Sequence, residues 1–230
     1  MADRTAEAAV PIRDAATVLL MRRDGGNGPA ILMGQRGAGA VFMPNKYVFP
    51  GGALDAADAG VTLASPLCET CTARLALDAP SGLAAPLAVA AIRELWEETG
   101  LVLGTSGAWP APVPEDWHGF AATGHLPAAA PLNFVFRAIT PPGRPRRFDA
   151  RFFLADAVHV MGDPDDFSQA SDELSHLHWV PLTEARKLNL PFITEVVLGE
   201  IAALADQSGP PGSVPFFDNS SDTPRFRRLA

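Results

Sequence analysis

Short apolar runs separated by glycine, proline and polar clusters occur throughout the first 60 positions of the chain. The runs at 15–21 and 30–35 flank the segment Asp-Gly-Gly-Asn-Gly at 24–28, which is typical of two strands joined by a glycine turn. Residues 47–49 predict a third strand that stops at Pro50, because proline cannot donate to a strand ladder. The glycines that follow allow a ligand to approach the backbone closely. We therefore expect a hairpin followed by a glycine loop.

The apolar positions after residue 85 predict both helices and strands. Pro86 suits the first turn of a helix, and Gly100 suits the position just past its end. Residues 59–85 show no sustained period and are expected to form an excursion, and 104–131 a long loop. Helical spacing returns at 191–205, and further strands are predicted at 101–103, 133–139, 152–160 and 174–180. This mixture predicts one α/β or α+β sandwich.

The length of 230 residues suits one well-elaborated domain, and the pattern does not require a second. The polar start at 1–11 and the proline-rich stretch 207–230 are expected to be flexible tails around a domain at 12–206. Residues 59–85 form an insertion within that domain. Because every apolar run is far shorter than the roughly 20 residues that span a bilayer, we expect no membrane span.

Charge and cysteine content narrow the classes of function. The net charge is −8, so the molecule repels polyanions and is not expected to bind nucleic acid. Cys68 and Cys71 cannot build a disulfide framework, and the chain start shows no continuous apolar leader, so a cytoplasmic location is expected. This lone CxxC pair also lacks the four ligands of a structural zinc site and the βαβ context of a redox pair.

Three glutamates near the end of the predicted helix carry the most informative pattern. At 100° per residue, Glu94, Glu97 and Glu98 share an arc of about 100°, with apolar side chains opposite. Clustered like charges repel unless a cation neutralises them, and oxygen-only ligands favour Mg²⁺ or Mn²⁺. Arg93 is the natural internal counter-charge. A solvated acidic helix face is the alternative.

The segment Arg-Glu-Leu-Trp-Glu-Glu-Thr-Gly-Leu at 93–101 resembles the catalytic helix of the Nudix hydrolases at every defined position. Gly52, followed after five residues by Asp58, resembles the opening of the same motif. Two features differ, because the family usually has Glu at Asp58 and places far fewer residues before the arginine than the 34 residues at 59–92. A long loop adds little closure entropy, so the motif can still assemble.

Four further segments are similar to the family branch that contains the peroxisomal coenzyme A diphosphatase, which also has an insertion in this motif. They lie at 31–36, 42–44, 48–55 and 147–155, and the whole resemblance runs from about residue 13 to residue 205. It implies the Nudix fold, an α/β/α sandwich with a mixed sheet. It also implies Mg²⁺- or Mn²⁺-dependent hydrolysis of a diphosphate that joins a nucleoside to another group, with coenzyme A or acyl-coenzyme A as the substrate.

The resemblance also assigns residue roles. Glu97, Glu98 and Glu94 are expected to bind the metal together with the Gly52 carbonyl, and Arg93 belongs to the catalytic set. Glu173, just before a predicted strand, is a candidate general base or else a solvated loop acid. Two other functions stay open: a pyrophosphatase for ADP-ribose or NADH, and a nucleotide-binding regulator without catalysis.

An excess of arginine within an acidic protein indicates where phosphate could bind. Arg144, Arg147 and Arg151 lie in one cluster with Arg137 and Arg146, and Arg36 follows a predicted strand. Arginines that merely cover apolar surface are the alternative. We expect the protein to bind a small nucleotide derivative and not a membrane. The oligomeric state is left open, and a homodimer is one possibility. Trp109 and Trp117 are expected either to stack on an adenine or to pack within the protein. His176 and His178 are expected either to lie near a metal or to be ordinary strand residues.

Overall fold

The computed structural model describes residues 10–23, 26, 28–110 and 112–230. Its main feature is a nine-stranded sheet in the order β10-β2-β1-β8-β7-β11-β12, with β3 paired to β2 and β4 paired to β1. The strands are β1 (Ile12–Arg22), β2 (Ala30–Arg36), β3 (Tyr47–Val48), β4 (Gly51–Ala53), β7 (Asn133–Ile139), β8 (Arg147–Asp156), β10 (Leu174–Pro181), β11 (Val214–Asp218) and β12 (Arg225–Leu229).

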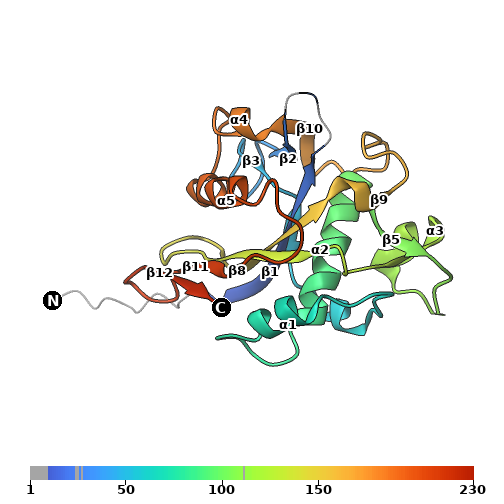
Figure 1. Ribbon diagram of the computed structural model, residues 1–230, viewed down its shortest axis with the longest axis horizontal. Helices are drawn as coiled ribbons and strands as arrows, with labels where there is room; N and C mark the ends of the chain where they lie inside the picture. The colour runs from blue at the N-terminus through green and yellow to red at the C-terminus, as the bar shows by residue number, and fades with distance from the viewer. Residues whose placement is uncertain (1–9, 24–25, 27, 111) are drawn as a thin grey trace.

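The sheet is mixed, because β1 runs parallel to β8 and β7 parallel to β11, whereas its other pairs are antiparallel. Helices cover both faces, α2 (Ala84–Thr99) on one side and α4 (Leu182–Ala185) and α5 (Phe192–Ala202) on the other (Figure 1). Alternation along β1 explains this division, since Val18 packs in the core with α2 and Leu19 in the core with α5. The predicted α/β sandwich is confirmed.

Helix α2 is buried along most of its length, with residues 87–93 all inaccessible or nearly so. Pro86 lies in its first turn, as predicted, where a missing backbone N–H costs nothing. Gly100 ends it in the left-handed conformation with φ 74°, and its N–H donates to the Trp96 carbonyl at 2.7 Å. Helix α5 confirms the helical spacing at 191–205.

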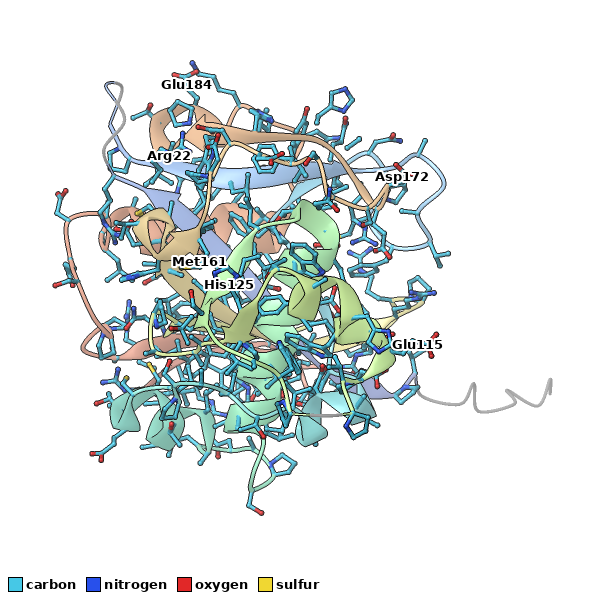
Figure 2. All side chains as sticks on the ribbon, turned by 90° about the vertical axis from the view of Figure 1, so that its right-hand side faces the viewer. Arg22, Glu115, His125, Met161, Asp172 and Glu184 are labelled. Carbon is cyan, nitrogen blue, oxygen red and sulfur yellow. The ribbon has the colours of Figure 1, made fainter. Side chains whose placement is uncertain are left out.

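The expectation of a structureless loop at 104–131 is wrong. This region contains most of β5 (Val102–Ser106), β6 (His125–Pro127), α3 (His118–Ala122) and the 3₁₀ turn η2 (Glu115–Trp117). β5 and β6 form a second, three-stranded sheet with β9 (Val160–Met161), which follows the 3₁₀ turn η3 (Ala157–His159). Figure 2 faces this side of the molecule, with His125 and Met161 labelled. Its packing depends on aromatic rings, since Trp117 lies 5.3 Å from Trp109 and 5.2 Å from Phe120. The two tryptophans are therefore packing groups.

The insertion is more ordered than the sequence indicated. It starts within the 3₁₀ turn η1 (Ala56–Gly60) and contains the helix α1 (Glu69–Leu75). Cys71 is buried, its sulfur accepts a hydrogen bond from the Phe134 N–H, and burial raises the pKa of its thiol to about 12. Arg137 of β7 donates to the carbonyls of Leu77 and Asp78 at 2.9 and 3.0 Å. These contacts hold the insertion against the main sheet.

The prediction of a flexible tail at 207–230 is corrected by strands β11 and β12. Val214, Phe216 and Leu229 are buried in the core with α2, and β11 continues the main sheet beside β7. The proline and serine content of this stretch suggests a loop, because local composition does not indicate pairing with a strand far away in the sequence. The tail predicted at 1–11 and the turn at 24–28 lie largely outside the described residues. Within the described part of the chain, the helices are too short or too polar to cross a bilayer.

Gly100→Ala should lower the unfolding free energy by about 2 kcal/mol, because alanine disfavours the left-handed conformation and its Cβ would lie 2.9 Å from the Gln169 Cβ. Gly124→Ala is the control, with φ 77° and no heavy atom within 4 Å of the added Cβ, and should cost about 1 kcal/mol. Urea unfolding midpoints measure both. Equal losses would show that the contact with Gln169 contributes nothing.

Candidate active site

The glycine loop lies directly over the carboxylates of α2. Strand β4 pairs with β1, with Gly52 opposite Ala16, and this pairing brings the loop to the helix. The Gly51 N–H donates to Glu98 Oε2 at 2.8 Å. A Cβ on Gly52 would meet the carboxylate atoms of Glu94, so a larger residue there would have to displace the end of the Glu94 side chain. The structure thus joins two halves of the motif that 34 residues separate in sequence.

Arg93 connects this site to the insertion. Its Nε and Nη2 donate to the two oxygens of Asp58 at 2.8 and 3.0 Å, and both side chains are buried. Its Nη1 donates to Glu94 Oε1 at 2.9 Å and to Glu97 Oε2 at 3.0 Å. Burial opposes the charge on Arg93, but the hydrogen bond with Asp58 and the nearby carboxylates raise its pKa above the usual range. Arg93 therefore holds three acids in place at once.

Asp58 has a second role in the local backbone. Its carboxylate accepts from the Asp55 N–H at 2.8 Å, while the Asp55 side chain accepts from Ala57 N–H, which forms a capping box around η1. Asp58 thus fixes both the Arg93 side chain and the turn that precedes the insertion. The sequence left the role of Asp58 open because its partner Arg93 is 35 positions away.

Burial excludes the reading of a solvated acidic helix face. Glu98 is 2% exposed, and burial raises its pKa to about 8 against the hydrogen bond from Gly51. Burial likewise raises the pKa of Glu94 to about 7, against the influence of Arg93, and raises the pKa of Glu97. Buried carboxylates disfavour their charged form unless positive charge is supplied. This cluster is therefore suited to a bound cation.

The donor chemistry fits a hard divalent cation, since every side-chain donor here is a carboxylate oxygen. Within residues 10–23, 26, 28–110 and 112–230, however, no three acidic, histidine or cysteine side chains converge as a preformed metal site. The hydrogen bonds explain why, because Arg93 holds Glu94 and Glu97 while Gly51 holds Glu98. Arg93 uses one oxygen of each glutamate, Glu94 Oε1 and Glu97 Oε2, so the second oxygen of each is left for a cation while Arg93 stays in place.

A cavity of about 1060 Å³ opens beside the carboxylates. Glu94 and Glu97 line it together with Glu173, which is exposed. The loop that carries Glu173 is attached to α2 by the Ser171 N–H, which donates to the Glu97 carbonyl at 2.9 Å. Strand pairing sets Leu174 opposite Arg36 and so brings Glu173 to the same end of the sheet as that arginine.

The predicted phosphate-binding arginines separate into two groups. Arg36 and Arg144 line the cavity, as does Arg146, and Arg36 Nε is buried with no hydrogen-bond partner among the described residues. The prediction that Arg151 binds phosphate is wrong, because its side chain is 1% exposed and is paired inside the fold with Asp14 and Asp149. Arg147 is also used internally, since it donates to the carbonyls of Thr140 and Asn219 at 3.0 and 2.7 Å. Part of the cluster is structural because Arg147 and Arg151 lie in β8 and bond within the fold, whereas Arg144 and Arg146 precede that strand and are exposed.

The sequence reasoning missed several cavity residues. Arg13, Lys46, Phe42 and Phe148 all line the cavity, and the two phenylalanine rings lie edge to face at 5.5 Å. Arg13 and Phe148 are paired across β1 and β8, and Phe42 and Lys46 come from the loop between β2 and β3, so no local signal identified them. His178 instead packs its ring against Tyr47 at 5.8 Å.

Comparison with known proteins agrees with this geometry, although no family model matches the sequence. A Caenorhabditis elegans protein named as a nudix hydrolase is 30% identical over 162 residues, which cover 65% of this chain. The match covers 46% of that relative, so the chain corresponds to less than half of its length.

Solved structures resemble the chain over most of its length. The crystal structure of a NUDIX hydrolase from Alicyclobacillus acidocaldarius has a TM-score of 0.64 at 26% identity, covering 87% of this chain and 98% of its own. The MutT protein from Methanosarcina mazei Go1 shares the fold, with a TM-score of 0.51 at 15% identity, covering 86% of this chain and 98% of its own. These similarities show that the chain shares the fold of the two solved structures, one of which is a NUDIX hydrolase.

Asp58→Asn should lower the unfolding free energy by about 3 kcal/mol, because it leaves the buried Arg93 without its charged partner. Asp78→Asn is the control, since its ion pair with Arg227 is exposed and should contribute about 0.5 kcal/mol. Chemical unfolding of both variants measures the difference. Similar losses in the two would contradict a special role for the buried pair.

Proposed function

We propose that the protein is a metal-dependent hydrolase that cleaves the diphosphate linkage of a nucleoside diphosphate derivative. The contact between Gly52 and the Glu94 carboxylate carries this proposal, because it assembles the separated motif at the mouth of a large cavity. Glu94, Glu97 and Glu98 would hold Mg²⁺ or Mn²⁺ together with the Gly52 carbonyl. Such a cation supplies charge neutralisation at the phosphate oxygens and a more acidic water.

The chain's own residues perform the remaining work. Arg93 orients Glu94 and Glu97 while Asp58 compensates its charge, so the helix presents its acids in a defined arrangement. Arg36, with its unpartnered Nε, is suited to donate to a phosphate oxygen of the substrate. Glu173 can accept a proton from the attacking water, because it is exposed in the cavity and its loop is anchored to α2.

Coenzyme A or an acyl-coenzyme A is the substrate that we favour, by resemblance to the branch with an inserted motif. Arg144 and Arg146 support it, since both line the cavity and both are exposed. They could bind a phosphate monoester outside the diphosphate. ADP-ribose and NADH lack that phosphate and are the alternative substrates. A regulator without catalysis is less well supported, because all three glutamates are present.

Glu97→Gln should lower kcat at least about a hundredfold, because it keeps the shape of a half-exposed side chain and removes a ligand charge. Exhaustive chelation should abolish turnover of the parent protein, and Mg²⁺ or Mn²⁺ should restore it. Hydrolysis would be followed by chromatography of both products. The exposed Glu69→Gln serves as a control with unchanged rates. Full turnover after chelation would contradict the proposed mechanism.

Replacing both Arg144 and Arg146 by alanine should remove the preference for coenzyme A over dephospho-coenzyme A, which differ only in the 3′-phosphate. We expect a parent preference of about tenfold or more in kcat/KM, since a charge-assisted hydrogen bond contributes about 1.5–3 kcal/mol. Arg225→Ala, an exposed arginine of β12 outside the cavity, is the matched control. Equal parent rates on the two compounds would reject the extra phosphate site, and faster cleavage of ADP-ribose would reject coenzyme A as the substrate.

A further inference from the structure

The floor of the cavity is a row of alanines that crosses neighbouring strands in register. Ala15 of β1 is paired with Ala53 of β4 on one side and with Ala150 of β8 on the other. Ala150 is paired in turn with Ala138 of β7. Paired residues in adjacent strands point to the same face of a sheet, and all four alanines line the cavity. Small side chains here leave a trough in the face that α5 covers elsewhere.

The row ends at an aromatic group. Ala138 is paired with Phe217 of β11, whose ring lies 6.3 Å from that of Phe192 at the start of α5. Phe192 is 68% exposed, and it lines the cavity together with Phe217. Five strands spaced by about 4.8 Å separate Ala53 from Phe217 by roughly 19 Å. The trough therefore runs from the glycine loop beside Glu94 to an exposed phenylalanine.

The neighbouring rows close the sides of the trough. Two residues from Ala15 in one direction along the strands, Arg13 is paired with Phe148, and two residues in the other direction, Thr17 is paired with Phe152. All four side chains line the same cavity. Larger residues thus flank a line of alanines, and the floor offers no charged group along its length. An extended and narrow group with apolar character fits this shape better than a second charged group does.

We propose that this alanine trough binds an elongated apolar arm attached to the second phosphate of the substrate, with Phe192 and Phe217 contacting the far end of the arm. The inference rests on the proposed function and adds a specificity that the catalytic motif does not contain. It makes the length of the arm, rather than the nucleoside, the property that this face of the sheet selects.

Esters of ADP that carry a methyl, butyl or octyl group on the terminal phosphate test this proposal, because only the arm varies. The kcat/KM should rise from methyl to octyl by at least about tenfold, since each fully buried methylene favours binding about fourfold. Methylene-bridged analogues, which cannot be cleaved between the phosphorus atoms, should show the same order of affinities by calorimetry without metal.

Variants locate the effect in the trough. Ala150→Leu fills the middle of the floor, and Phe192→Ala removes the exposed ring, so each should reduce the octyl-to-methyl ratio at least about threefold. Phe226→Ala is the matched control, because that phenylalanine is 52% exposed, packs 6.2 Å from Phe217 and lies outside the cavity. It should keep the parent ratio.

The outcomes separate the two proposals. Hydrolysis of every ester at similar rates, or affinities that do not change with arm length, would overturn the trough and leave the diphosphatase standing. Affinities that rise with arm length while no ester, coenzyme A or ADP-ribose is hydrolysed would overturn the enzyme and leave the trough as a binding site. A parent ratio retained in Phe192→Ala and Ala150→Leu would also overturn the trough.

Discussion

The buried ion pair between Arg93 and Asp58 is the interaction on which the rest of the site depends. It joins the helix that carries the glutamates to the turn that follows the glycine loop. Two buried charges are unfavourable apart, so each holds the other, and the backbone attached to each, in one place. Residues 59–83, which precede α2, can therefore form a separate excursion without loosening the site. Loop-closure entropy grows slowly with length, which allows this arrangement.

The same arginine explains how three acids can lie together in a largely buried place. Glu94 and Glu97 are hydrogen-bonded to Arg93, and Glu98 to the Gly51 N–H. Raised pKa values of about 7 and about 8 at Glu94 and Glu98 show that this compensation is incomplete. Carboxylates left partly uncompensated are suited to a divalent cation. The site is thus prepared for charge that the protein alone does not supply.

The face of the sheet opposite α2 has a different physical character. Helix α5 covers one part of it with apolar packing, and the alanine row leaves another part hollow. Glu94 and Glu97 reach the same cavity because the glycines of β4 let α2 approach the strand closely. One continuous cavity therefore combines acidic, cationic and apolar parts. A molecule with a diphosphate, a further phosphate and an apolar arm would meet each of them.

The sequence by itself determined the hairpin, the helix that ends at Gly100 and the position of Glu94, Glu97 and Glu98 on one face of that helix, because local periodicity and end signals specify them. It could not determine that 207–230 forms strands, since their partners lie far away along the chain. Nor could it tell Arg144, which lines the cavity, from Arg151, which is buried beside Asp149. Burial and strand register decide such questions, and both arise only when distant segments pack together. The Asp58 partner and the alanine row were decided by the tertiary structure for the same reason.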